Sequence, residues 1–329
     1  MSVPYVTVEN LNVTFTGGAR PVKAVNGVDL CVNRGEVAAL IGESGSGKSV
    51  TLRSILRLHN ERRTQITGSI KVGGQDVLKL SKTALENFRG KTAAMIFQEP
   101  LLALDPVYSV GAQIVESIRR HENISADDAR KRALELFERV RIPSPERRLD
   151  AYPHEMSGGM RQRAMIALAL SCKPQLLLAD EPTTALDATV QIQVLLLLRE
   201  LQREFGLSVI FVTHDIGAAV EVADRIAVMY AGRIVEEGPV ATLLRAPRHP
   251  YTMALLRSRA HGAMEKVDGQ RPRLETIAGA PPDLSLPQTG CAFAPRCTLA
   301  NDDCKQTQPE ALAISAGHSA RCLRLDATA

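Results

Sequence analysis

The clearest chemistry lies in eight consecutive residues, Gly42–Ser49, which read Gly-Glu-Ser-Gly-Ser-Gly-Lys-Ser. Their spacing matches the GxxxxGK[ST] pattern of a phosphate-binding loop. The glycines permit a tight turn whose N–H groups converge on one concavity, and a helix that begins there adds partial positive charge. The pattern predicts that Lys48 reaches the phosphates and that the Ser49 hydroxyl binds Mg²⁺. The loop residues expected to hold nucleotide are Gly42, Ser44, Gly45, Gly47, Lys48 and Ser49.

A pair of carboxylates, Asp180 and Glu181, follows an apolar run over Gln175–Ala179 that predicts a buried strand. Ligands of α/β folds bind where parallel strands end, so both acids are expected at a ligand site. Asp180 can bind Mg²⁺, and Glu181 can orient or deprotonate a water in line with the γ-phosphate. Because Pro182 follows directly, the alternative that both acids cap a helix is disfavoured.

Two other predicted strands also end in polar side chains. Gln98 follows Lys91–Phe97, and its amide oxygen can ligate Mg²⁺ or the attacking water. His214 follows Leu207–Thr213 and can hydrogen-bond a γ-phosphate oxygen. A lone histidine at a strand end is more often structural, but its place behind the carboxylate pair favours the phosphate role.

Two further features predict contacts with nucleotide. Ser157, Gly158 and Gly159 open a predicted helix and form a second anion-binding terminus. We expect this terminus to close over nucleotide held by another copy or a partner, the alternative being an ordinary capped helix. Phe15 ends a predicted strand and can stack on the adenine ring, or it is simply a core residue.

The elements that must position these residues are strands and helices of an expected α/β fold, in which the phosphate-binding loop connects a strand to a helix. Strands are expected at 6–15, 28–32, 37–41, 91–97, 175–179 and 207–213, and helices at 50–59, 110–121, 126–140 and 188–205. An antiparallel hairpin is expected around Gly73-Gly74 and another around Ala231-Gly232. Residues from about 101 to 157 are expected to form a helical insertion.

The composition is that of a globular protein of about two domains, at roughly 150 residues each. The chain has 329 residues, and no apolar run approaches the ~20 residues of a membrane span. Its start lacks the regions of a signal peptide, so we expect a cytoplasmic protein. The net charge of +4, with acids and bases interleaved, and the absence of Trp argue against a nucleic-acid surface.

Four of the six cysteines gather near the C-terminus with the spacing C-x₅-C-x₆-C-x₁₇-C. In a cytosolic protein such a cluster argues for metal rather than disulfides. Four thiolates suit a [4Fe–4S] cluster or a structural zinc, although the close CxxC pairs usual for zinc are missing. His318 is a spare zinc ligand, and reduced thiols that cap a small subdomain are the third alternative. The candidate ligands are Cys291, Cys297, Cys304 and Cys322.

The ordered set of motifs resembles the nucleotide-binding subunit of ATP-binding-cassette transporters, over about residues 5–245. The resemblance implies a RecA-like P-loop NTPase core with an antiparallel β subdomain and a helical signature subdomain at about 101–170. The motif that departs is the signature, where Met160 replaces the common glutamine. The implied parts are Gly42–Ser49 as Walker A, Gln98 as the Q-loop, Ser157–Gln162 as the signature, Leu176–Asp180 as Walker B, Glu181 as the catalytic carboxylate, Ala185–Asp187 as the D-loop whose Asp187 contacts the nucleotide site, and His214 as the switch histidine.

The C-terminal part resembles the extension of oligopeptide/dipeptide importer ATPases, most of all subunits of the dipeptide-permease D type. The segments that carry this resemblance are Arg248–Thr252, Gly279–Pro282 and Gly290–Cys297. It implies a nucleotide-binding domain over residues 1–245 and a small Cys-rich extension over 246–329. Some members of this group are associated with an iron–sulfur cluster in this tail, which favours [4Fe–4S] over zinc here.

The resemblance implies an ATPase that powers import of di- or oligopeptides, using ATP and Mg²⁺. Implied partners are a homologous second ATPase subunit, two permease subunits and an extracytoplasmic solute-binding protein, with this chain on the cytoplasmic face of the bacterial inner membrane. The same machine for a nickel chelate, glutathione or another solute stays open. Two rivals are a soluble cassette ATPase acting on ribosomes or DNA, and an ATP-gated scaffold without hydrolysis.

Overall fold

The computed structural model describes residues 4–184, 186–259 and 277–328. The chain divides into two compact units. The first unit consists of Met1–Thr7, Cys31–Val37 and Lys71–Val212, and the second of Val8–Leu30, Ala38–Ile70 and Thr213–Ala329. The expected boundary near residue 245, between a nucleotide-binding domain and an extension, stays a prediction.

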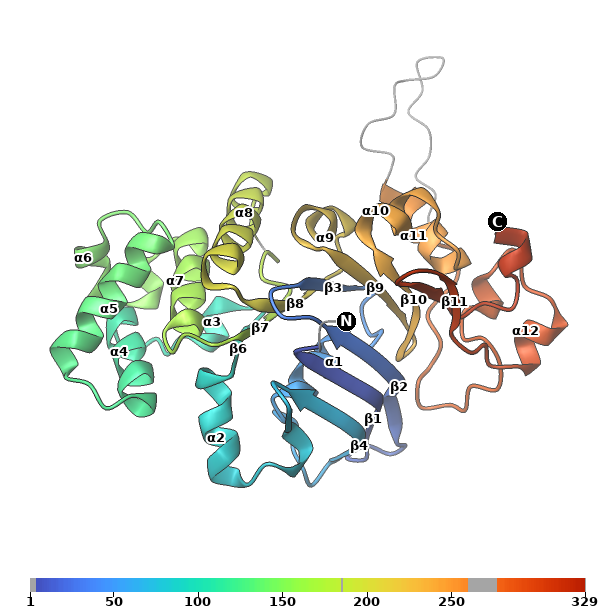
Figure 1. The fold of residues 1–329 in the computed structure, drawn as a ribbon, viewed down its shortest axis with the longest axis horizontal. Helices are drawn as coiled ribbons and strands as arrows, with labels where there is room; N and C mark the ends of the chain where they lie inside the picture. Colours follow the sequence, from blue (N-terminus) through green and yellow to red (C-terminus); the bar gives the residue numbers. More distant parts are fainter. Residues whose placement is uncertain (1–3, 185, 260–276, 329) are drawn as a thin grey trace, which may run out of the picture. The chain divides into compact units, whose positions relative to one another are not determined.

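Three parallel strands form the centre of the first unit (Figure 1). Strand β7 (Leu176–Asp180) pairs with β6 (Ala93–Ile96) on one side and with β8 (Ser208–Thr213) on the other. Every residue of these strands is buried, which explains why each is a continuous apolar run rather than an alternating one. Because the strands are parallel, the residues that follow β6 and β7 emerge at the same edge.

Several helices of the first unit begin at capping side chains. Ser109 and Ser125 accept hydrogen bonds from the first turns of α4 (Val110–His121) and α5 (Ala126–Arg139). These two helices, which Figure 1 draws in green, form the expected helical insertion together with α6 (Pro145–Leu149). The other helices of this unit are α2 (Lys82–Lys91), α3 (Pro100–Ala103), α7 (Gly158–Leu170) and α8 (Ala188–Phe205).

A five-stranded run of sheet forms the centre of the second unit. Strand β9 (Arg225–Tyr230) is parallel to β3 (Val37–Ile41) and antiparallel to β10 (Arg233–Pro239). The predicted β9–β10 hairpin is confirmed, and both of its turn residues, Ala231 and Gly232, have positive φ. Beyond β10 lie two antiparallel strands that we did not expect from the sequence, β12 (His318–Ala320) and β11 (Leu312–Ser315).

Three longer strands of the second unit lie in the order β2 (Val22–Val32), β1 (Val6–Phe15) and β4 (Thr64–Val72). The last residues of β4 pair antiparallel with β5 (Gln75–Asp76), which confirms the predicted hairpin at Gly73-Gly74. The helices of the second unit are α1 (Lys48–Ile55), α9 (Ile216–Val222), α10 (Val240–Arg245), α11 (Pro250–Arg259) and α12 (Asp302–Gln306).

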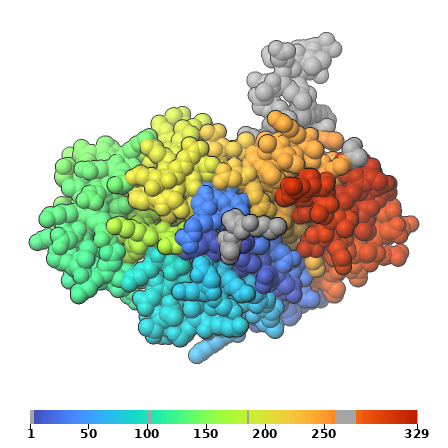
Figure 2. All heavy atoms as spheres, viewed as in Figure 1, coloured from blue at the N-terminus to red at the C-terminus, as the bar shows by residue number. Residues whose placement is uncertain are grey.

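The C-terminal region, defined here as residues 246–259 and 277–328, belongs to the second unit. Its strand β12 pairs with β10, with Glu236 opposite Ala320. Figure 2 shows the red atoms of its end packed against the orange atoms that precede them in the chain. Within the part of the chain that the structure describes, no helix is both long and apolar enough to cross a membrane.

Candidate functional site

The predicted phosphate-binding loop connects β3 to α1 in the second unit. Gly42 has φ +154°, and a Cβ there would lie 2.1 Å from the Met229 carbonyl oxygen. Gly47 has φ +104°, and its Cβ would lie 2.4 Å from the Ala24 carbonyl oxygen. The loop therefore needs glycine at both positions, for backbone conformation and for space. The expected strand, turn and helix are present, although α1 begins at Lys48 rather than at 50.

Lys48 is the first residue of α1 and is 4% exposed. Its Nζ donates to the carbonyl oxygens of Gly42 and Glu43, each at 2.8 Å, so the ammonium spans the turn. The Ser46 hydroxyl is also buried, and no other described residue hydrogen-bonds to it. A buried cation, a hydroxyl and a helix N-terminus suit an anionic ligand such as a phosphate.

The carboxylate pair lies at the end of β7 in the first unit. Asp180 is fully buried, while Glu181 is half-buried and has φ +45°, an unusual conformation for a residue with a side chain. The Glu181 N–H donates to Val212 across 2.9 Å, which ties this strained position to β8. Strain of this kind persists where the surrounding structure holds it, often at functional sites.

Gln98 and Glu181 are 83 residues apart in sequence but adjacent in space. The Gln98 amide nitrogen donates to Glu181 Oε2 across 3.3 Å, and the Thr184 hydroxyl donates to the same oxygen across 3.0 Å. The amide therefore turns its nitrogen, not the oxygen expected to ligate Mg²⁺, towards the carboxylate. Both donors fix the direction of the Glu181 side chain.

The signature and D-loop residues lie at the beginnings of two helices of the first unit. Exposed Ser157 caps α7, and its hydroxyl accepts from the Met160 N–H across 3.3 Å. Asp187 caps α8 in the same way, through the Val190 N–H. A Cβ on Gly159 would lie 2.9 Å from Val190, so glycine allows these two helix beginnings to approach. Gly158 is the first residue of α7, and Ala185 of the D-loop lies outside the described residues.

The remaining predicted nucleotide contacts lie in the second unit. Phe15 is half-buried at the end of β1, and its ring meets His59 edge-on at 5.5 Å between centroids. His214 is exposed and follows β8. Ser44, Gly45 and Ser49 lie in the phosphate-binding loop and at the start of α1, and Ser49 offers a hydroxyl oxygen of the kind that Mg²⁺ prefers.

The predicted metal cluster of the C-terminal region is wrong. No group of three or more His, Cys, Asp or Glu side chains within the described ranges is placed to hold a metal ion. Burial raises the pKa of the Cys291 and Cys297 thiols and that of Cys322 to about 11, so the free thiols stay protonated at neutral pH. His318, the spare zinc ligand, instead lies 2.8 Å from the Glu236 carboxylate.

Both the [4Fe–4S] cluster and the zinc alternative therefore fail, together with the metal-binding description of this tail. The cysteines are free thiols, of which Cys304 and Cys322 are buried. The Cys291 N–H donates to the Cys304 carbonyl oxygen across 2.8 Å, so backbone hydrogen bonds hold the segments together. This arrangement agrees with the third alternative, reduced thiols in a small packed subdomain.

Sequence reasoning missed the residues that hold Glu43, the second residue of the phosphate-binding loop. They are Tyr251 of α11 and Arg296, both from the C-terminal region. Both lie in segments on which the resemblance to importer ATPases rests. The sequence offers one signal, the acid Glu43 inside an anion-binding loop, and nothing near it in the sequence indicates which residues it contacts.

Comparison with known proteins gives two family matches. A family model described as ABC transporter matches residues 25–184, and one described as oligopeptide/dipeptide transporter, C-terminal region, matches residues 235–304. A peptide import ATP-binding protein of Brucella abortus (strain 2308) is 48% identical over 328 residues, covering 98% of this chain and 97% of the relative. Another, of Brucella melitensis biotype 1, is 46% identical over 321 residues, covering 98% and 95%.

Solved structures show the same fold. A dimeric bacterial ABC transporter cassette has a TM-score of 0.64 and 29% identity, covering 71% of this chain and 98% of the cassette. The same cassette in a post-hydrolysis state bound to ADP and phosphate has a TM-score of 0.64 and 30% identity, with the same coverage. These likenesses confirm the predicted α/β cassette fold with its P-loop.

Proposed function

The chain belongs to the ATP-binding-cassette transporter family, and from this premise we propose that it is the ATP-hydrolysing subunit of an importer of di- or oligopeptides. The observation that carries the proposal is the glycine-dependent loop whose turn is spanned by the buried Lys48 ammonium. The peptide cargo is supported by the family match over residues 235–304 and by the names of the relatives.

Each predicted site residue has a role in ATP hydrolysis that follows from its own chemistry. In the second unit, Lys48 and the loop N–H groups bind the phosphates, and the Ser49 hydroxyl would ligate Mg²⁺, which neutralises phosphate charge when bound. In the first unit, the Asp180 carboxylate would ligate Mg²⁺. Glu181 accepts the proton of the attacking water, in an orientation that Gln98 maintains. His214 contacts the γ-phosphate, and Phe15 stacks on the adenine ring.

The proposed importer also needs partner subunits. Ser157, Gly158 and Gly159 close over the nucleotide of a second, homologous ATPase subunit, and exposed Ser157 is available for that contact. Asp187 lies at the same junction. Peptide import needs a path through a membrane, so two permease subunits and an extracytoplasmic solute-binding protein are the further partners. We place the chain peripherally on the cytoplasmic face of the bacterial inner membrane.

The test is ATP hydrolysis by the chain purified with its membrane partners in lipid vesicles. The rate is compared with and without a solute-binding protein loaded with di- or tripeptides, and the same binding protein without peptide is the control. Stimulation that requires the peptide is the expected result. The rate of ATP hydrolysis that remains in a complex carrying Glu181→Gln measures any contaminating ATPase.

Three other outcomes would change the proposal. Indifference to peptide with stimulation by a nickel chelate, glutathione or another solute would keep the importer and replace its cargo. A chain that hydrolyses ATP but purifies without any membrane partner would favour the soluble cassette. A chain that binds ATP without hydrolysing it in the assembled complex would favour the scaffold.

A further inference from the structure

A carboxylate stands inside the phosphate-binding loop and is neutralised by a residue from the C-terminal region. Arg296 Nη1 lies 2.7 Å from Glu43 Oε2, and Arg296 Nη2 lies 3.0 Å from Glu43 Oε1. This is the bidentate pairing in which both guanidinium nitrogens engage one carboxylate. The Arg296 side chain is 5% exposed and that of Glu43 is 26% exposed, so solvent screens the pair only in part.

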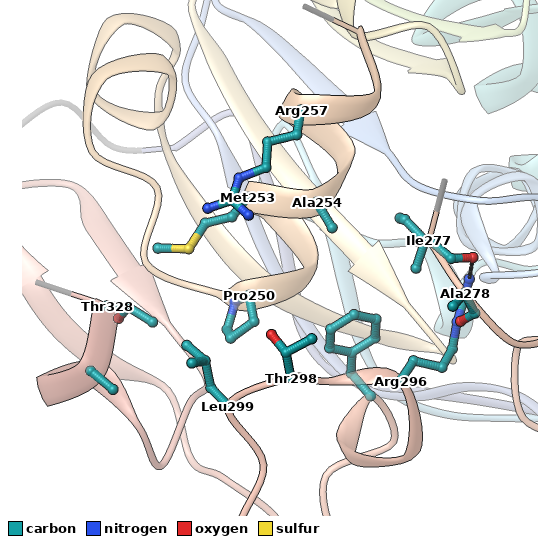
Figure 3. Close-up of a pocket in the computed structure, with 12 residues that line it drawn as sticks. Pro250, Met253, Ala254, Arg257, Ile277, Ala278, Arg296, Thr298, Leu299 and Thr328 are labelled. Atoms are coloured by element: carbon teal, nitrogen blue, oxygen red, sulfur yellow. Dashed lines mark hydrogen bonds between the residues drawn. The ribbon is translucent and has the colours of Figure 1, made fainter. Parts of the chain in front are cut away.

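The guanidinium is held in place independently of Glu43. Arg296 Nε donates to the Ala278 carbonyl oxygen at 2.9 Å and Nη2 to that of Ile277 at 3.1 Å, as Figure 3 shows. Nη1 also donates to the Tyr230 hydroxyl at 3.3 Å. The pairing with Glu43 raises the pKa of Arg296 further, so this group stays charged. Arg296 is therefore a fixed cation to which the loop is attached.

The backbone of Glu43 is held from the same region. Its N–H donates to the Tyr251 hydroxyl across 2.8 Å. Tyr251 is fully buried and packs against Tyr230 at 4.6 Å and Phe293 at 5.3 Å between ring centroids. The Glu43 carbonyl oxygen accepts from Lys48 Nζ, so the residue that the C-terminal region holds also positions the phosphate-binding ammonium.

We propose that Arg296 and Tyr251 are positioning residues for ATP binding, through which the C-terminal region sets the charge and shape of the phosphate-binding loop. Arg296 cancels the negative charge of Glu43, which would otherwise repel the phosphates, and Tyr251 fixes the Glu43 backbone next to Lys48. The inference rests on the proposed function, because it assigns these residues to the nucleotide site described above.

The test measures the affinity of the full-length chain for a fluorescent ATP analogue, and the KM and kcat of ATP hydrolysis in the assembled complex. Arg296→Met should weaken nucleotide binding roughly tenfold and raise KM more than it lowers kcat, since the unpaired carboxylate opposes phosphate binding. The loss should shrink at high salt because the carboxylate is partly exposed. Arg296→Lys should recover part of the affinity, and Tyr251→Phe should weaken binding without changing the salt dependence.

The decisive variant is the double substitution Glu43→Gln with Arg296→Met. Removing the carboxylate removes the repulsion, so affinity should return close to that of Glu43→Gln alone. Arg248→Met is the matched control, because this arginine belongs to the same region but its guanidinium donates to Thr328. Its nucleotide affinity should equal that of the unaltered chain, and the melting temperature of each variant identifies those that fold.

Unchanged affinity in Arg296→Met would overturn the proposal. A loss that Glu43→Gln fails to restore, or that salt does not reduce, would also overturn it, because a purely structural arginine gives that pattern. If Arg296→Met does not fold, Arg296→Lys and Tyr251→Phe carry the test, and normal affinity in both refutes the inference. An unaltered complex that binds the analogue but hydrolyses no ATP would instead contradict the proposed function.

Discussion

The side-chain amide of Gln98 donates to the carboxylate of Glu181 across 3.3 Å, joining the ends of two parallel strands. The Thr184 hydroxyl donates to the same oxygen, and the backbone of Glu181 is held at φ +45°. Two donors on one oxygen and a fixed backbone leave the carboxylate little freedom. This arrangement is suited to a group that must meet a water at a defined place.

Glu181→Gln should keep ATP binding and reduce turnover by roughly a hundredfold to a thousandfold, because an amide cannot accept the proton of the attacking water. The measurement is single-turnover hydrolysis in the complex, beside the affinity for a fluorescent ATP analogue. Glu99→Gln, which alters a nearby exposed acid, is the control and should hydrolyse normally. Unchanged turnover in Glu181→Gln would remove Glu181 from the role of base.

Lys48→Ala should lower nucleotide affinity by roughly tenfold to a hundredfold, since a charge-assisted hydrogen bond to phosphate is worth about 1.5–3 kcal/mol. Equilibrium titration of the full chain with the fluorescent analogue measures this loss. Lys79→Ala removes a lysine whose side chain is 84% exposed and should bind as the unaltered chain does. Equal affinity in both variants would mean that the loop does not bind phosphate through Lys48.

The loop and its flanking elements were predictable because the information is local. Eight contiguous residues specify the turn. Sequence alone does not reveal why glycine is needed at 42 and 47, where a Cβ would collide with the carbonyl oxygens of Met229 and Ala24. The strands β6, β7 and β8 were predictable for a similar reason, because strands buried on both faces are continuous apolar runs.

Long-range side-chain chemistry was not predictable. Glu43 and Arg296 are 253 residues apart, and no local sequence pattern indicates their ion pair. The cysteine spacing suggested a metal because spacing alone does not show whether the side chains meet around one ion, and within the described ranges they do not. His318 likewise looked like a spare ligand until its ring was found beside Glu236.

Glu236 should be the acid on which the stability of the second unit depends most. It is 1% exposed and accepts from the N–H groups of Arg248 and His249 at 2.7 and 2.8 Å, with His318 Nε2 at 2.8 Å. Glu236→Ala leaves these buried donors without an acceptor and should lower the free energy of unfolding by about 3–5 kcal/mol.

Urea denaturation followed by circular dichroism measures this change. The matched control is Glu237→Ala on the same strand, whose partner Arg225 lies 3.2 Å away in a pair that is about a quarter exposed. Solvent screens this pair in part, so its loss should cost less than that of the buried Glu236. Similar losses of unfolding free energy in both variants would show that the burial of Glu236 does not make it more important for stability than Glu237.

His249 should make the protein less stable in mild acid. It is fully buried, its Nδ1 accepts from the Tyr251 N–H across 3.1 Å, and burial lowers its pKa to about 3. The unfolded chain has an ordinary histidine pKa of about 6.5, so between these values the unfolded state binds the extra proton and stability falls as pH falls. Between pH 7 and pH 5 the contribution lost should be about 2 kcal/mol.

Urea denaturation at both pH values should show that loss in the unaltered chain and a smaller one in His249→Asn, which keeps an acceptor near Nδ1 but does not titrate. Equal pH dependence in the two proteins would mean that His249 is not the group responsible.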